Sequence, residues 1–139
     1  MKKQLFCLML GIFLMAPVAY AGQGYVTEVF SSEAVAEAGT ATSTAIPIKS
    51  GGYFGVWYKA VSAGGTPDVL LEYQMSYDDT STNFVEPANA ADIETNLTVE
   101  TAKIKSIQPP PMPYLRIKAT GNAANPADTV LTVYLFVQE

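Results

Sequence analysis

Apolar and polar side chains alternate along most of the chain after residue 24, in short runs separated by clusters of Gly, Pro, Asn, Asp and Ser. This period of two residues is typical of β-strands, and the clusters are typical of turns. The candidate strands are Tyr25 to Phe30, Thr44 to Ile48, Tyr53 to Ser62, Val69 to Tyr77, Asn96 to Glu100, Lys103 to Ile107, Tyr114 to Ala119 and Thr129 to Gln138. Seven to eight short strands predict an all-β fold, an antiparallel β-sandwich of jelly-roll type.

One stretch has the composition of a short helix, Ser32 to Ala38. The segment from Glu86 to Asp92 is rich in Pro, Asn and Ala, and we interpret it as a compact loop between two strands. The sequence has no internal repeat and no long linker. We therefore expect residues 22 to 139 to form a single domain.

The segment Ala63 to Asp68 is a turn by composition, so it predicts a hairpin between the strands on either side. Pairing Ser62 with Val69 puts Tyr58 opposite Tyr73 on a uniformly apolar face. A shift of the pairing by one residue would set apolar faces against polar ones. The sequence therefore specifies which residues of the two strands share a face.

The other face of this predicted hairpin places Lys59 opposite Glu72 and Trp57 opposite Gln74. A polar face that meets water explains these residues without any ligand. The alternative is a binding platform, in which a sugar ring stacks on Trp57 while the three polar side chains fix its hydroxyl groups.

Asp78 and Asp79 begin a polar loop that also contains Asn83. Their oxygen atoms suit a calcium ion, for which Glu86 or Asp92 would complete the ligand set. The alternative is a strand-ending turn in which the Asp and Asn side chains bond to nearby backbone amides. The loop lacks the spacing of the helix-loop-helix calcium motif, and calcium is the only cofactor that the sequence suggests.

The last predicted strand is apolar on both faces. Leu131, Val133, Leu135 and Val137 form one face, and Val130, Tyr134 and Phe136 contribute to the other. Such a strand is central in a sheet or covered by another chain, because an open apolar edge invites aggregation. Val130, Tyr134 and Phe136 are therefore candidate interface residues, for self-association or for contact with other surface proteins.

The N-terminus resembles an export signal. Lys2 and Lys3 precede the apolar run Leu5 to Met15, and Ala19 to Ala21 form a small-residue cleavage site. The apolar run is shorter than the roughly 20 residues of a spanning helix. We expect residues 1–21 to be a signal peptide, and the mature protein to be periplasmic, extracellular or on the cell surface, with no membrane insertion.

Charge and composition narrow the possible chemistry. Loss of Lys2 and Lys3 changes the formal net charge from −5 to −7, which disfavours nucleic acid as a partner. The chain has no histidine, and its one cysteine, Cys7, lies in the expected signal peptide. A mature chain without His or Cys has no triad-type nucleophile and no common zinc site. We therefore expect a protein that is not an enzyme.

Several residues carry a family resemblance: Tyr73-x-x-Ser76-x-Asp78, then Phe84, then Pro110-Pro111 before Tyr114-Leu115-Arg116-Ile117. Their order resembles the C-terminal half of discoidin-like, galactose-binding jelly rolls, and also small β-sandwich modules of virion and bacterial surface proteins. The resemblance implies a jelly-roll fold and a binding or structural module, and it assigns no ligand residues.

Two functional hypotheses follow. The first is a secreted structural or assembly module without enzymatic activity, supported by the apolar last strand and by an N-terminal strand, Tyr25 to Phe30, that could be exchanged between subunits. The second is a carbohydrate-binding module that uses the aromatic platform around Trp57.

Overall fold

The computed structural model describes residues 24–48, 53–62, 66–88, 92–98, 100–122 and 129–138. The expected signal peptide lies outside the described residues. The elements are β1 (Tyr25–Val35), β2 (Thr40–Thr42), β3 (Ile46–Pro47), β4 (Tyr53–Ser62), β5 (Val69–Ser76), the short 3-10 helix η1 (Ser81–Asn83), β6 (Glu94–Leu97), β7 (Lys103–Ile107), β8 (Tyr114–Gly121) and β9 (Thr129–Gln138).

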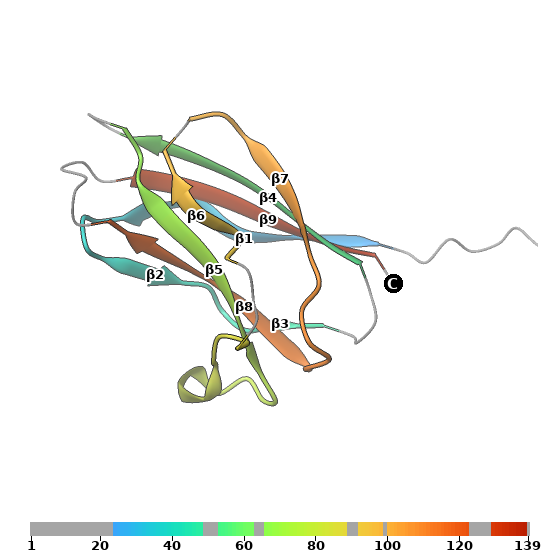
Figure 1. Ribbon diagram of the computed structural model, residues 1–139. Helices are drawn as coiled ribbons and strands as arrows, with labels where there is room; N and C mark the ends of the chain where they lie inside the picture. Colours follow the sequence, from blue (N-terminus) through green and yellow to red (C-terminus); the bar gives the residue numbers. More distant parts are fainter. Residues whose placement is uncertain are drawn as a thin grey trace, which may run out of the picture.

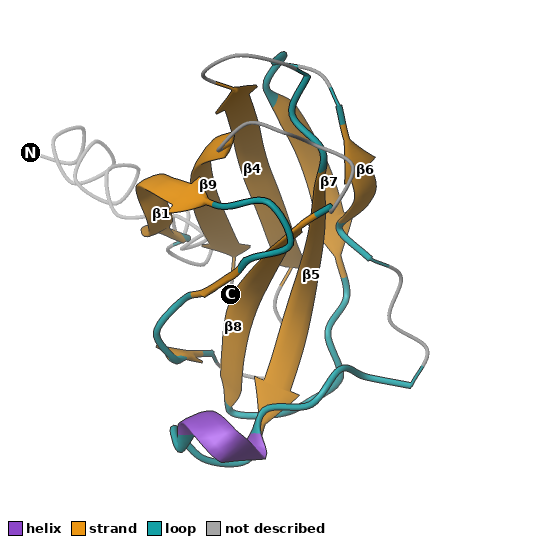
Figure 2. Cartoon of the chain, turned by 90° about the vertical axis from the view of Figure 1, so that its left-hand side faces the viewer, coloured by secondary structure: helices purple, strands orange, loops and turns teal. Residues whose placement is uncertain are grey.

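The strands form two packed antiparallel sheets (Figures 1 and 2). Sheet A has the order β1-β9-β4-β7, and sheet B has the order β2-β8-β5-β6, with β3 also paired to β8. The predicted antiparallel β-sandwich is therefore confirmed.

The strand pairs are nested along the chain. β1 pairs with β9, β2 and β3 pair with β8, β4 pairs with β7, and β5 pairs with β6. This is the pattern of one long hairpin that has been wrapped into two layers. The additional pairs β4–β9 and β5–β8 then complete sheet A and sheet B. Such wrapping defines a jelly roll.

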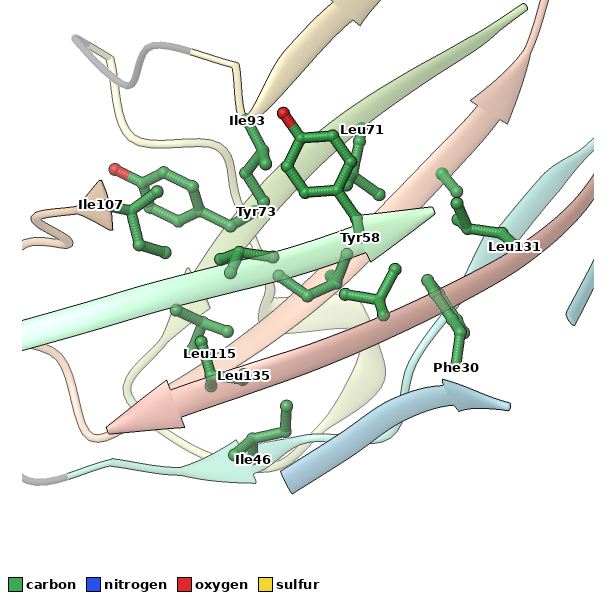
Figure 3. Close-up of a cluster of buried hydrophobic side chains, with 14 of the residues drawn as sticks. Phe30, Ile46, Tyr58, Leu71, Tyr73, Ile93, Ile107, Leu115, Leu131 and Leu135 are labelled. Atoms are coloured by element: carbon green, nitrogen blue, oxygen red, sulfur yellow. The ribbon is translucent and has the colours of Figure 1, made fainter. Parts of the chain in front are cut away.

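The predicted hairpin between β4 and β5 is wrong, because the two strands belong to different sheets. The chain between them crosses the sandwich, and Pro67 in this crossing is buried. The prediction that Tyr58 and Tyr73 both lie on the apolar faces of their strands is nevertheless right. Tyr58 and Tyr73 both point into the core, from opposite sheets rather than from neighbouring strands (Figure 3).

The predicted helix at Ser32 to Ala38 is also wrong. Residues 32–35 continue β1, with Val35 opposite Thr129 of β9. The strand accommodates two irregularities in register, and Ser32 lies within the second one, between Phe30 and Glu33, with φ of 56°. Pairing with β9 outweighs a local helical preference that rests on only a few Ala and Glu residues.

The core lies between the inner faces of the two sheets. β4 and β9 supply alternate residues from sheet A, and β5 and β8 supply them from sheet B. Its fully buried side chains include Val56, Leu71, Met75, Leu115, Ile117, Leu131, Val133 and Leu135. Because these positions alternate with outward ones, each sheet also presents a second face to the outside.

Candidate functional site

The outer face of sheet A is built by the residues that alternate with the core positions. Cross-strand pairing sets Glu28, Tyr134, Trp57 and Ile104 in one row across the four strands, and Val26, Phe136, Gly55 and Ser106 in the next. Farther along, Lys59 lies opposite Thr132, and Val61 lies opposite Val130. We call this surface, together with Tyr53 at its end, the sheet A face.

Large apolar side chains are concentrated on the sheet A face. The described residues include seven exposed large hydrophobic side chains, and five of them lie in strands of sheet A: Val26, Tyr53, Val61, Ile104 and Phe136. Ile104 is 72% exposed and Tyr53 is 74% exposed. Single exposed apolar residues are normal on a protein surface, but here neighbouring strands bring them together.

Trp57 is part of this surface and is half-buried in it. Its ring centroid lies 5.6 Å from that of Tyr134, with the ring planes inclined at 58°. The Tyr134 hydroxyl donates a 3.1 Å hydrogen bond to Glu28 Oε1, and this contact raises the pKa of Tyr134. These two contacts of Tyr134 therefore connect β1, β9 and β4 on the sheet A face.

A shallow hollow of about 560 Å³ lies at one end of the face. Its lining includes Val26, Tyr53, Gly55, Ser106 and Phe136. A Cβ atom at Gly55 would meet only Phe136 Cβ, at 3.8 Å, so the glycine leaves open space on the strand. Tyr53 and Trp57 flank this space because they lie two residues on either side of Gly55.

The predicted platform of four residues is not brought together. Trp57 and Lys59 lie on the sheet A face, whereas Glu72 and Gln74 lie on the outer face of sheet B. The expected pairing of Lys59 with Glu72 is wrong for the same reason as the hairpin: the chain crosses between the sheets after β4.

On sheet B, the polar residues pair with β8. Glu72 Oε2 accepts a hydrogen bond from Lys118 Nζ at 3.0 Å, and Glu86 Oε1 accepts another from the same nitrogen at 3.2 Å. Both contacts raise the pKa of Lys118, the one to Glu72 more strongly. Gln74 Oε1 accepts a 2.7 Å hydrogen bond from Arg116 Nε. These polar side chains on the outer face of sheet B are therefore paired with one another, whereas Leu70 and the buried Thr120 hydroxyl, on the same face, have no such contact within the described residues.

The loop of the predicted calcium site is closed by its own hydrogen bonds. Asn83 Nδ2 donates to Asp78 Oδ2 at 2.8 Å and to Oδ1 at 3.1 Å, and Thr80 N donates to Oδ1 at 3.1 Å. Asp79 is exposed. Across the described ranges, no three His, Cys, Asp or Glu side chains are grouped for a metal ion. These bonds are those of a strand-ending turn, and calcium binding stays a prediction.

The three predicted interface residues share the sheet A face. Val130, Tyr134 and Phe136 point away from the core on β9, and Phe136 is 41% exposed. β9 is bordered on both sides, by β1 and β4, so it is central in its sheet and has no open edge. Of the two explanations for an apolar strand, the central position is confirmed.

The sequence did not predict that Ile104 is on the outer face, because in β7 two lysines point inward and the apolar residue between them points outward. Lys103 and Lys105 lie on the same side of β7 as the buried Ile107. Lys103 Nζ reaches Glu94 Oε2 at 2.7 Å, and Lys105 Nζ reaches the Asp92 carbonyl at 2.6 Å. Inward-pointing lysines on an edge strand leave the apolar Ile104 outside. The position of Ile104 between two lysines was the available signal.

None of the helices in the described ranges has the length and apolar character needed to cross a membrane. No protein-family model matches the chain, and no curated protein sequence matches it. The resemblance to discoidin-like modules therefore stays a prediction.

Solved structures give distant similarities. The K1 cleaved adhesin domain of Lys-gingipain from Porphyromonas gingivalis is 15% identical with a TM-score of 0.43, over 84% of this chain and 79% of that one. A chain in the structure of infectious bursal disease virus is 15% identical with a TM-score of 0.37, and the match spans 84% of this chain but 30% of the viral one.

Proposed function

We propose that this protein is a non-enzymatic β-sandwich module that works outside the cytoplasm as a structural or assembly unit, and that the sheet A face is its assembly surface. The observation that carries the proposal is the contrast between the two outer faces. The sheet A face gathers five of the seven exposed large hydrophobic side chains of the described residues, while the outer face of sheet B carries Lys118 paired with Glu72 and Glu86.

The size of the surface fits a protein interface. Four strands spaced about 4.8 Å apart span roughly 19 Å, and the two central strands, with 10 residues each, extend over roughly 33 Å. A stable interface needs about 800 Å² from each partner, measured over side chains rather than on a flat projection. The sheet A face approaches this size, and its apolar centre is typical of assembly surfaces.

The charges favour a second copy of this chain as the partner. Glu28 and Lys59 are the charged members of the sheet A face as defined above, so the face has no formal net charge although the whole chain has −5. Two acidic molecules therefore meet with least repulsion at this surface.

The test is the mass of the purified protein in solution, measured by light scattering over a series of concentrations. We expect the wild type to form a dimer or larger assembly and Ile104→Lys to shift it toward the monomer. Val85→Lys is the matched control, because Val85 is 61% exposed but lies beside sheet B. A wild type that stays monomeric at every concentration would contradict the proposal, as would equal effects of the two variants.

Glycan binding is the second candidate function, and one observation favours it. The hollow at Gly55 has the aromatic side chains Tyr53 and Phe136 in its lining, with Trp57 beside it, and aromatic rings are the usual stacking surfaces for sugars. A glycan array that compares the wild type with Trp57→Ala and with the control Tyr77→Ala tests this function. Binding that only Trp57→Ala removes would support it.

A further inference from the structure

A second hollow, of about 540 Å³, lies beside sheet B and shares no lining residue with the sheet A face. It is formed where the β2–β3 connection, the η1 loop and the start of β8 meet; η1 is the purple helix at one end of the sandwich in Figure 2. Its lining consists of Ser43, Thr44, Ala45, Pro47, Asp79, Ser81, Phe84, Tyr114 and Arg116.

Arg116 is held rigidly at this hollow. Its Nε donates to Gln74 Oε1 at 2.7 Å, and its Nη1 donates to the Ser81 carbonyl oxygen at 3.0 Å. The Cζ atom lies 4.5 Å from the ring centroid of Phe84, so the guanidinium also contacts an aromatic face. Three groups from different parts of the chain thus fix one cation in place.

The positive charge of Arg116 has no carboxylate partner within the described ranges. Lys103 and Lys118, in contrast, each form an ion pair with a glutamate. A guanidinium has five N–H donors, and the two hydrogen bonds above leave the others for a ligand. Burial lowers the pKa of Arg116 below its usual range.

The groups around Arg116 indicate the class of ligand. A fixed guanidinium is suited to two parallel hydrogen bonds with a carboxylate. Thr44 and Tyr114 carry hydroxyl groups, and Pro47 adds an apolar ring. Asp79 can accept hydrogen bonds from hydroxyl groups, and its negative charge disfavours a dianionic phosphate.

We propose that this hollow binds an acidic monosaccharide, with the sugar carboxylate on Arg116 and the sugar hydroxyls near Thr44, Tyr114 and Asp79. The volume lies within the range of small-molecule sites, about 300–1,000 Å³. Gln74 acts as a positioning residue, since it holds Arg116 Nε. The proposal is independent of assembly through the sheet A face, because the two surfaces belong to different sheets.

The experiment is an NMR titration of the wild-type protein with three probes: glucuronate, its methyl ester and glucose. We expect glucuronate to saturate with a millimolar Kd and to shift the signals of Arg116 Nε and of the Thr44 and Ser81 amides. The ester and glucose should bind at least about tenfold more weakly, because they lack the carboxylate charge. Absence of saturable binding by glucuronate, or equal binding of the acid and its ester, would overturn the proposal.

A pair of charge variants tests the location while Gln74, Ser81 and Phe84, the contacts of Arg116, stay unsubstituted. Thr44→Glu places a negative charge at the hollow and should weaken glucuronate binding at least about tenfold. Thr42→Glu is the matched control, since Thr42 is exposed on β2 and does not line the hollow. If Thr44→Glu binds glucuronate as well as the wild type does, the site is elsewhere. Unchanged solution mass in both variants would show that assembly is a separate property.

Discussion

The Tyr58 hydroxyl on β4 donates a 2.9 Å hydrogen bond to Glu94 Oε2 on β6, so one side chain connects sheet A to sheet B. The same carboxylate oxygen accepts a 2.7 Å hydrogen bond from Lys103 Nζ on β7. These three residues join the edge strands β6 and β7 along one side of the sandwich. Tyr58 is only 2% exposed, and this side of the core is therefore closed by a hydrogen-bonded group rather than by apolar packing alone.

Removal of the Tyr58 hydroxyl should weaken the link between the sheets. We expect Tyr58→Phe to lower the free energy of unfolding by about 1 kcal/mol, the usual contribution of one hydrogen bond, with somewhat more if the carboxylate is left poorly solvated. Urea unfolding followed by tryptophan fluorescence measures the change. Tyr53→Phe is the control, because Tyr53 is 74% exposed in the same strand and should change stability by less than about 0.5 kcal/mol. Equal effects would contradict the structural role of the Tyr58 hydroxyl.

Alkaline pH should act on the same hydrogen bond. Burial, with the hydrogen bond to Glu94, raises the pKa of Tyr58 from 10.0 to about 12. The unfolded chain therefore loses this proton at lower pH than the folded protein does. The contribution of Tyr58 to stability is complete below pH 10 and is lost as the pH rises toward 12. Unfolding midpoints across this window should fall less steeply in Tyr58→Phe than in the wild type, and parallel slopes would contradict the assignment.

At Glu94 the dependence of stability on pH should have the opposite direction, because the contribution of this residue is lost as the pH falls. The hydrogen bond from Lys103 is the main reason that the pKa of Glu94 lies below its ordinary 4.5. Its contribution is present above pH 4.5 and is lost as the pH falls through the pKa of the folded state. Glu94→Gln should therefore flatten the acid limb of a stability profile. Glu37→Gln, at an exposed turn position, should leave that limb as steep as in the wild type.

Two glycines, one in each sheet, should lose different amounts of stability when replaced by alanine. At Gly121 a Cβ atom would lie 2.3 Å from the Ala36 carbonyl oxygen, a backbone atom that cannot rotate away. We expect Gly121→Ala to cost about 1–3 kcal/mol, as overpacking does. At Gly55 the added Cβ meets only Phe136 Cβ, at 3.8 Å, and the change should be smaller than about 0.5 kcal/mol. Thermal unfolding of both variants compares them directly.

The sequence predicted the inward-facing apolar residues of the long strands, because alternation with a period of two is a local property, but Glu72, which was expected to meet water, is only 7% exposed. Its bounds for β4, β7 and β9 match the structure, and Tyr58 and Tyr73 are both in the core. The partners of each strand were not predictable in the same way. A turn rich in glycine can close a hairpin or carry the chain across a sandwich, and its composition does not distinguish the two.

The candidate site was also not fully predictable from the sequence, because its composition depends on which strands pair. Trp57 and Phe136 were identified separately, and only the pairing of β4 with β9 shows that they share one face. Glu72 and Gln74 were assigned to that face because of the incorrect hairpin. Ile104 was missed because the lysines on either side of it point inward on an edge strand, where they reach polar groups near β6. Such inversions depend on the position of a strand in its sheet, which a single sequence does not contain.

The nested pairing also fixes when the fold can form during synthesis. β9 is translated after every other described strand, yet it lies between β1 and β4 in sheet A. A nascent chain that lacks its last ten-residue strand has no sheet neighbour for β1 and only the short β7 beside β4. Long-range pairing of this kind is slow and leaves apolar strands exposed while it is incomplete. Sheet A therefore cannot be completed before β9 has been synthesised, and until then the apolar residues of β1 and β4 lack the strand that lies between them.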